Sequence, residues 1–166
     1  IGIASFQTGY KKGSQKDLSY AAEKASSSVV NIFISNRGIN RARNAVGSGV
    51  IFSEEGHIVT NTHILTNATS VFVEFNDGEI TEAVLIGADK YSDIAVLKIN
   101  GFEGLNPIES AESSNIRVGD EVLAIGNPFG VGKTVTSGII SATGRDYGNP
   151  YFCLLYTSPS PRDFLL

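Results

Sequence analysis

His63 and Asp93 have the residue types, and the order along the chain, of a proton-transfer pair. His63 stands in the stretch TNTHIL, directly after a β-like run, and Asp93 begins the mostly apolar segment DIAVLKI. A carboxylate so close to a buried strand is costly unless a cation or a hydrogen-bond donor partners it. An imidazole can be that partner, because the carboxylate holds its Nδ1–H while Nε2 accepts a proton from a nucleophile. On residue types and spacing alone, a structural His–Asp pair is the more common case, and the alternative is that His63 is a general base oriented by Asp93.

The nucleophile that such a base would serve is harder to find. A catalytic serine needs a glycine-lined turn that exposes its Oγ and aims backbone N–H groups at the oxyanion. The serines considered lie in expected strands or in the C-terminal tail: Ser48, Ser137, Ser141, Ser158 and Ser160. None has a turn of that kind, so we predict that none is the nucleophile.

Metal and cofactor chemistry has little support in the sequence. His57, the other of the two histidines, follows a turn glycine and is expected at the surface. A His57–His63 metal site has no third ligand at a convincing spacing. Cys153 is the single cysteine, so it cannot form an internal disulfide, and no Cys/His set has zinc spacing. The sequence therefore predicts neither a metal nor a cofactor.

Short alternating segments separated by turns predict the elements that must position His63 and Asp93. A helix is expected from Asp17 to the serines at 26–28, and Asn76-Asp77-Gly78 is a strong hairpin turn because Asp and Gly accept positive φ. The expected strands are 29–35, 47–53, 57–60, 69–75, 79–88 and 93–99, followed by 121–126 and 133–144. The first six predict a closed antiparallel barrel, and the last two predict the start of another.

Composition excludes several classes of protein. With 166 residues, 42% of them hydrophobic and 18% charged, the chain is expected to be globular. A net charge of −4 without a dense Lys/Arg cluster argues against nucleic-acid binding. No apolar run is long enough to span a membrane. Because the chain contains no methionine, we expect that it does not begin at a translation start.

The C-terminal segment CLLYTSPSPRD, residues 153–163, differs from everything before it. It shifts abruptly to a Ser/Pro-rich composition without periodicity. It resembles the in-frame translation of a transposase sequencing adaptor; a genuine proline-rich tail is the alternative. We expect this tail to be non-native and the natural protein to continue beyond Tyr151.

Five segments together resemble the HtrA (Deg-type) trypsin-like serine proteases, in that family's order and approximate spacing: GSGVIF, TNTHIL, SDIAVLKI, VLAIGNPFG and TVTSGIISATGR. The resemblance covers about residues 18–150 and is closest to the DegS-like branch. It implies that His63 is the general base and Asp93 its orienting carboxylate, in a cleft between two orthogonal six-stranded β-barrels. It also implies a GNSGG segment with the nucleophile and the oxyanion donors. This chain contains no such string, and Gly148-Asn149-Pro150 lacks the serine.

The resemblance and the alternation together suggest a division of the chain. The expected parts are a linker or post-anchor segment (1–17), a short helix (18–28), the first barrel (29–100), a connector (101–120), the start of a second barrel (121–152) and the non-native tail (153–166). The first barrel would supply both His63 and Asp93. Its loop 36–46 matches a region that varies in the family and often makes contacts between subunits.

The function that the resemblance implies is that of an HtrA-type serine endopeptidase in envelope protein quality control or stress signalling. Substrates would be unfolded proteins or a membrane-bound regulatory protein in the bacterial periplasm. The full protein would be a homotrimer with a following PDZ domain, and an inner-membrane anchor would precede residue 1. Without a nucleophile, we expect this chain to be inactive.

The sequence also fits two alternative functions. The first is a non-catalytic, protease-like barrel that binds peptides or partner subunits. The second is a cysteine variant of the same fold that uses Cys153, which the lack of surrounding glycines argues against.

Overall fold

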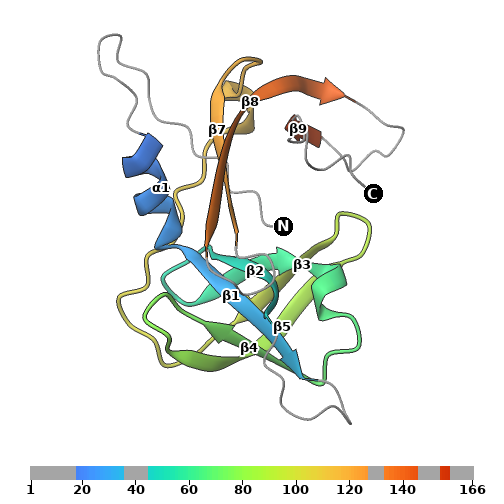
Figure 1. Cartoon of the computed structure of the whole chain (residues 1–166). Coiled ribbons are helices and arrows are strands. Elements are labelled where there is room, and N and C mark those ends of the chain that lie inside the picture. Colours follow the sequence, from blue (N-terminus) through green and yellow to red (C-terminus); the bar gives the residue numbers. More distant parts are fainter. Residues whose placement is uncertain (1–17, 36–44, 127–132, 146–153, 158–166) are drawn as a thin grey trace.

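The chain folds into a six-stranded closed barrel and a three-stranded sheet beside it (Figure 1). The computed structural model describes residues 18–35, 45–126, 133–145 and 154–157. Within these ranges the structure is mostly β, with one short α-helix, α1 (Leu18–Ser26). The predicted all-β architecture, with a complete first barrel and a partial second one, is confirmed.

The barrel strands follow the sequence alternation closely. They are β1 (Val29–Ser35), β2 (Ala45–Ile51), β3 (His57–Asn61), β4 (Ser70–Glu74), β5 (Ile80–Asp89) and β6 (Ile94–Lys98). Every pair is antiparallel, and the order around the barrel is β1-β2-β3-β6-β5-β4. Pairing of β1 with β4 closes the ring.

Side chains at every second position fill the barrel. In β3, Ile58 and Thr60 are buried while their neighbours are half-buried, and Val71 and Val73 repeat this pattern in β4. The largest fully buried side chains in the barrel core are Ile32, Ile51, Ile58, Leu97 and Ile99. Burying one such side chain stabilises a protein by about 1.5–3 kcal/mol. The alternation that predicted the strands is therefore also the pattern that builds the core.

The hairpin between β4 and β5 forms where the sequence predicted it. Gly78 has a φ of +86°, and the backbone N–H of Glu79 donates to Asp77 Oδ1 at 2.9 Å. Phe75 N donates to Glu79 O at 2.9 Å and closes the turn.

Helix α1 ends at the predicted serines and packs against the second sheet. Ser27 Oγ donates to the carbonyl of Lys24 at 2.7 Å, which satisfies one of the last helical carbonyls. Ala21 and Ala25 are buried against β7 (Glu121–Gly126), in a cluster that includes Leu123 and Ile125. The expected N-cap, Asp17, lies outside the described residues. Among the residues that the structure describes, no helix has the length and apolar character needed to cross a membrane.

The carbonyl of Ser26 joins α1 to both β units. Asn76 Nδ2 donates to it at 3.0 Å from the β4–β5 turn, and Lys133 Nζ donates to the same oxygen from the residue before β8 (Thr134–Arg145). Burial lowers the pKa of Lys133 to about 8, because the protonated amine loses water in this position.

The connector between the two β units is attached to the barrel. Ile108 N donates to Ile51 O at 2.8 Å, and the rings of Phe102 and Phe75 lie 4.8 Å apart between their centroids. A 3-10 turn, η2 (Ser113–Asn115), precedes β7.

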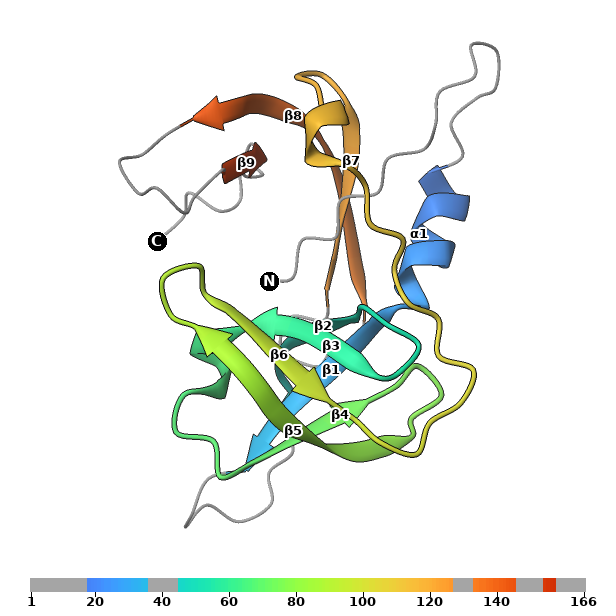
Figure 2. The same cartoon turned by 180° about the vertical axis from the view of Figure 1, so that it is seen from behind.

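The second sheet has one strand that the sequence did not predict. Its order is β7-β8-β9, and β9 (Leu154–Thr157) falls in the segment for which no periodicity was found. Strand β7 pairs with Thr134–Ile139 of β8, and β9 pairs with the remaining part (Figure 2). Tyr and Thr favour strands, so a short run that contains them beside an unpaired strand edge can join it even without alternation.

Candidate active site

His63 lies in a short 3-10 turn and faces solvent, and the residue directly after it in that turn is anchored in the barrel core. Strand β3 ends at Asn61, and η1 (Thr62–Leu65) follows directly. Ile64 is buried and belongs to the barrel core, whereas the His63 side chain is 64% exposed. The buried side chain of Ile64 therefore anchors the turn that carries the exposed imidazole.

Asp93 stands just before β6, at the end of a turn that another aspartate organises. The carboxylate of Asp89 accepts from Tyr91 N and from Ser92 Oγ, both at 2.9 Å. These two bonds lower the pKa of Asp89. Asp93 itself has a φ of +55°, in the left-handed region that aspartate tolerates better than most residues. In both views this turn rises from the barrel on the side of the second sheet (Figures 1 and 2).

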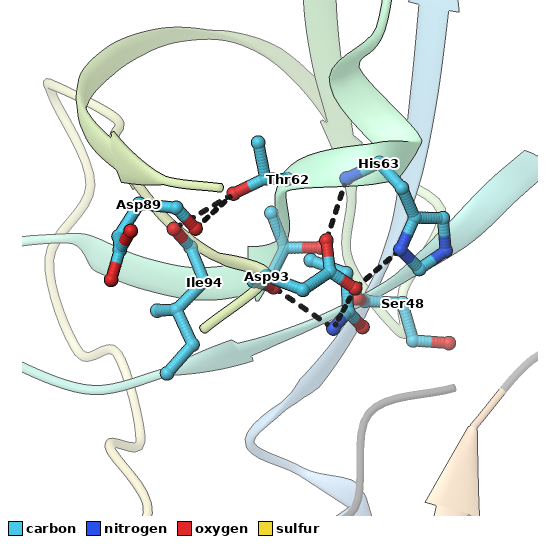
Figure 3. A network of polar contacts seen from close by, with 8 residues as sticks. Ser48, Thr62, His63, Asp89, Asp93 and Ile94 are labelled. Carbon is cyan, nitrogen blue, oxygen red and sulfur yellow. Dashed lines mark hydrogen bonds and ion pairs between the residues drawn. The ribbon is translucent and has the colours of Figure 1, made fainter. Parts of the chain in front are cut away.

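The two side chains meet in a close, two-point contact. His63 Nδ1 lies 2.5 Å from Asp93 Oδ2, and the backbone N–H of His63 donates to Asp93 Oδ1 at 2.9 Å. The pKa of Asp93 is lowered, first by the His63 backbone N–H, then by the imidazole and by Asn61. The second ring nitrogen of His63 points away from the carboxylate (Figure 3). An ionised carboxylate at Nδ1 favours the tautomer that keeps the proton there and leaves Nε2 as an acceptor.

The residues before His63 bind the turn that carries Asp93. Asn61 Nδ2 donates to both Asp93 O and Asp93 Oδ2, each at 3.1 Å. Thr62 N donates to Asp93 O at 3.1 Å, and Thr62 Oγ1 donates to the carbonyl of Ile94 at 2.8 Å, with Asp89 O at 3.2 Å. Asn61, Thr62 and His63 thus hold the Asp93 turn through backbone and side-chain hydrogen bonds.

The serines considered from the sequence lie in strands or outside the described residues. Ser48 is buried in β2, and its carbonyl accepts from Thr60 Oγ1 at 2.9 Å. Ser137 and Ser141 are exposed within β8. Ser158, Ser160, Cys153 and the Gly148–Pro150 stretch lie outside the described residues.

His57 is less exposed than the sequence suggested. It is half-buried at the start of β3, and its Nδ1 lies 2.7 Å from Ser53 Oγ across the β2–β3 turn. The turn brings the two polar side chains together and so shields the ring. Among the residues that the structure describes, no three His, Cys, Asp or Glu side chains are grouped as metal ligands would be.

Comparison of the sequence and the structure with known proteins shows to which family this chain belongs. The family described as the trypsin-like peptidase domain matches residues 47–162, more than half of the chain, and this span contains both His63 and Asp93. The chain belongs to this family, in its HtrA-type branch. The trypsin-like fold predicted from the sequence is thereby confirmed.

The similar proteins are longer than this chain. The serine endoprotease DegS of Salmonella typhimurium (strain 14028s / SGSC 2262) is 43% identical over 137 residues, which cover 79% of this chain and 38% of that protein. The periplasmic serine endoprotease DegP of Escherichia coli (strain K12) is 50% identical over 102 residues, 61% of this chain and 22% of its own length. A solved structure described as the HtrA-type protease AlgW with tripeptide has a TM-score of 0.70 and 42% identity, over 80% of this chain and 42% of that one. The chain thus spans about two fifths of the DegS and AlgW chains that it matches.

Sequence reasoning about this HtrA-type chain named the histidine and the aspartate but missed the residues that hold them. Asn61 and Thr62 appeared only within the motif around His63, and Asp89 fell between the expected strands 79–88 and 93–99. A signal for Asp89 was present, because an aspartate followed three residues later by a serine often closes a turn through its own side chain. Nothing in the sequence indicated that the Asn61 amide would reach the backbone and carboxylate of Asp93.

Proposed function

We propose that this chain provides the proton-transfer half of an HtrA-type serine endopeptidase, with His63 as general base and Asp93 as its orienting carboxylate. The observation that carries the proposal is the contact of 2.5 Å between His63 Nδ1 and Asp93 Oδ2, with an exposed imidazole. Membership of the trypsin-like peptidase family supports the same assignment.

The chemistry follows from the free ring nitrogen. A serine Oγ–H would give its proton to His63 Nε2 as Oγ attacks the peptide carbonyl, and the imidazolium so formed is stabilised by the ionised Asp93. His63 then returns the proton to the departing amine nitrogen, which leaves an acyl-enzyme. Water, deprotonated by the same nitrogen, releases the acid and restores the serine.

The serine of this reaction is not among these residues. The sequence contains no GNSGG string, and Ser48, Ser137 and Ser141 stand in strands β2 and β8. Loss of the nucleophile and of the oxyanion donors removes nearly all catalysis from such a site. We therefore propose that the 166-residue chain does not hydrolyse peptides by itself.

The setting of the reaction is proposed from the similar proteins. A DegP relative is named periplasmic, and AlgW was solved with a tripeptide. We place this protein in the bacterial periplasm, tethered to the inner membrane, with unfolded or regulatory proteins as substrates. The assembly proposed for the full-length protein is a homotrimer.

A chimera tests the proposal. Residues 1–150 would be joined to the remainder of the DegS protease domain, which supplies a serine, and casein hydrolysis would be measured. Activity should appear and should fall by roughly three to four orders of magnitude in His63→Ala and Asp93→Asn variants of the chimera. An active chimera that tolerates His63→Ala would refute the assignment of the base. A folded chimera that binds peptide but does not cleave it would support the alternative of a binding module.

A further inference from the structure

We infer that Asn61 is a positioning residue for the His63–Asp93 pair, a role that rests on the proposed function. Its side-chain nitrogen donates to two atoms of one residue, the backbone carbonyl and the carboxylate Oδ2 of Asp93, each at 3.1 Å. That same Oδ2 holds the imidazole Nδ1. Asn61 therefore binds both the backbone and the reacting side of the aspartate.

The chemistry of the contact fixes the orientation of the amide. Both partners on Asp93 are oxygen acceptors, so the NH2 group of Asn61, and not its carbonyl, must face them. An NH2 group has two hydrogens, which is the number that the two acceptors need. Asn61 is half-buried at the end of β3, where its backbone is paired with Ile94, so its Cα position is set by the sheet.

Asp93 needs this support because of its own backbone. A φ of +55° places it in a left-handed conformation that costs L-residues roughly 1–2 kcal/mol. Thr62 N also donates to the Asp93 carbonyl. Among the hydrogen bonds described, none joins Thr62 to the Asp93 carboxylate. Without Asn61, the His63 backbone N–H would still hold Oδ1, but Oδ2 would be held by the imidazole alone. Asn61 therefore supplies the contact to Oδ2 that does not depend on the imidazole. The amide thus orients the carboxylate before the imidazole carries charge.

A neutral amide suits this position better than a charged group. A lysine or arginine here would neutralise Asp93 and weaken its interaction with an imidazolium. An aspartate would place a second negative charge beside Oδ2. Asparagine supplies the hydrogen bonds and leaves the net charge of the carboxylate available to His63.

The test is nuclear magnetic resonance of the 166-residue chain with ¹⁵N-labelled histidine, which needs no enzymatic activity. In the unsubstituted chain near neutral pH, the His63 ring should carry its proton on Nδ1, with a downfield resonance that exchanges slowly with water. In Asn61→Ala, the ring should become a mixture of tautomers, and exchange of the Nδ1 proton should accelerate by about tenfold. Asn61→Leu, which keeps a branched side chain without the hydrogen-bonding groups, should do the same if Asn61→Ala disturbs folding.

Asn31→Ala is the matched control. The Asn31 amide donates to a carboxylate in the same barrel, Glu74 Oε2 at 2.8 Å, far along the sequence from the His–Asp pair. This control should leave the His63 tautomer and the proton exchange unchanged. If the unsubstituted chain lacks the Nδ1 signal, the proposed base and the role of Asn61 both fail. If it shows the signal and the Asn61 variants behave like Asn31→Ala, only the role of Asn61 is overturned.

Discussion

The Cδ1 atom of Ile64 occupies the space into which a Cβ on Gly47 would project. Gly47 lies in β2, and Ile64 lies in η1, directly after His63. A glycine in a strand costs backbone entropy, and here the missing side chain admits the neighbour that anchors the turn. The position of His63, the candidate base, thus depends on the absence of a side chain at Gly47 in strand β2.

Gly47→Ala should therefore destabilise the barrel and displace His63. The added methyl group would push Ile64 outward, and overpacking of this kind costs about 1–3 kcal/mol. Urea unfolding would measure the loss of stability, and the His63 resonances would report the displacement. Gly87→Ala is the control, because a Cβ on Gly87 would meet nothing within 4 Å. The same stability for both variants would contradict the role of the Gly47–Ile64 contact.

The carboxylate of Asp93 should make stability depend on acid pH. Its pKa is lowered in the folded chain, chiefly by the backbone N–H of His63. The unfolded chain then binds more protons at low pH, so the stabilisation is complete above the ordinary aspartate pKa of about 3.9 and is lost as pH falls through the lower folded value. We expect the stability difference between the unsubstituted chain and Asp93→Asn to be largest near pH 7 and to shrink below pH ~4. An equal difference at both ends of a urea-unfolding pH series would disprove this.

The turn that carries Asp93 should loosen when Asp89 is replaced by alanine. Asp89→Ala removes the acceptor for Tyr91 N and Ser92 Oγ. We expect faster amide hydrogen exchange at Tyr91 and a weaker Nδ1 proton signal at His63.

Asp77→Ala is the matched control for this variant. Its carboxylate accepts the Glu79 backbone N–H at 2.9 Å in the β4–β5 turn, a bond of the same kind in another hairpin. It should speed exchange at Glu79 and leave His63 unaffected. A His63 signal that is unchanged in Asp89→Ala would show that the turn does not need its aspartate.

Lys133 should make stability rise with pH on the alkaline side. Burial lowers its pKa in the folded chain to about 8, whereas in the unfolded chain the amine keeps a pKa near 10.4. Between these values the unfolded state binds more protons, so folding becomes more favourable as pH increases. Because the amine is only partly buried and solvent screens it, we expect a gain of no more than about 1 kcal/mol between pH ~8 and pH ~9.5, which Lys133→Met should abolish. If both chains show the same slope in urea unfolding, the amine does not titrate as described.

Much of the barrel could be predicted from sequence because its determinants are local. The buried positions of β3 and β4 recur every second residue, and Asp77 and Gly78 mark the hairpin after β4. The end of α1 at its serines is likewise encoded within a few residues. These features are determined by residues that are close in the sequence and do not depend on distant contacts.

The features that the sequence did not reveal depend on how the folded strands and turns pack in three dimensions. The Asn61 amide and the Asp93 turn come together only because β3 pairs with β6. The bond between Ser53 and His57 depends on how tightly one hairpin turns. Strand β9 depends on an edge of β8 that β7 leaves unpaired. The residue types and order of His63 and Asp93 suggested a proton-transfer pair, and the family resemblance strengthened that hypothesis. Their catalytic role stays a prediction.

The register of β3 and β6 sets an order of events during synthesis. Asn61 pairs with Ile94, so the imidazole can meet its carboxylate only after β6 has emerged and docked. By then β1 through β5 have already been synthesised. The contact between His63 and Asp93 joins residues far apart in the sequence and closes the loop between them. A ribosome-bound chain that ends before Asp93 would hold a histidine without its aspartate. The contact between His63 and Asp93 thus requires β6 to be docked on β3.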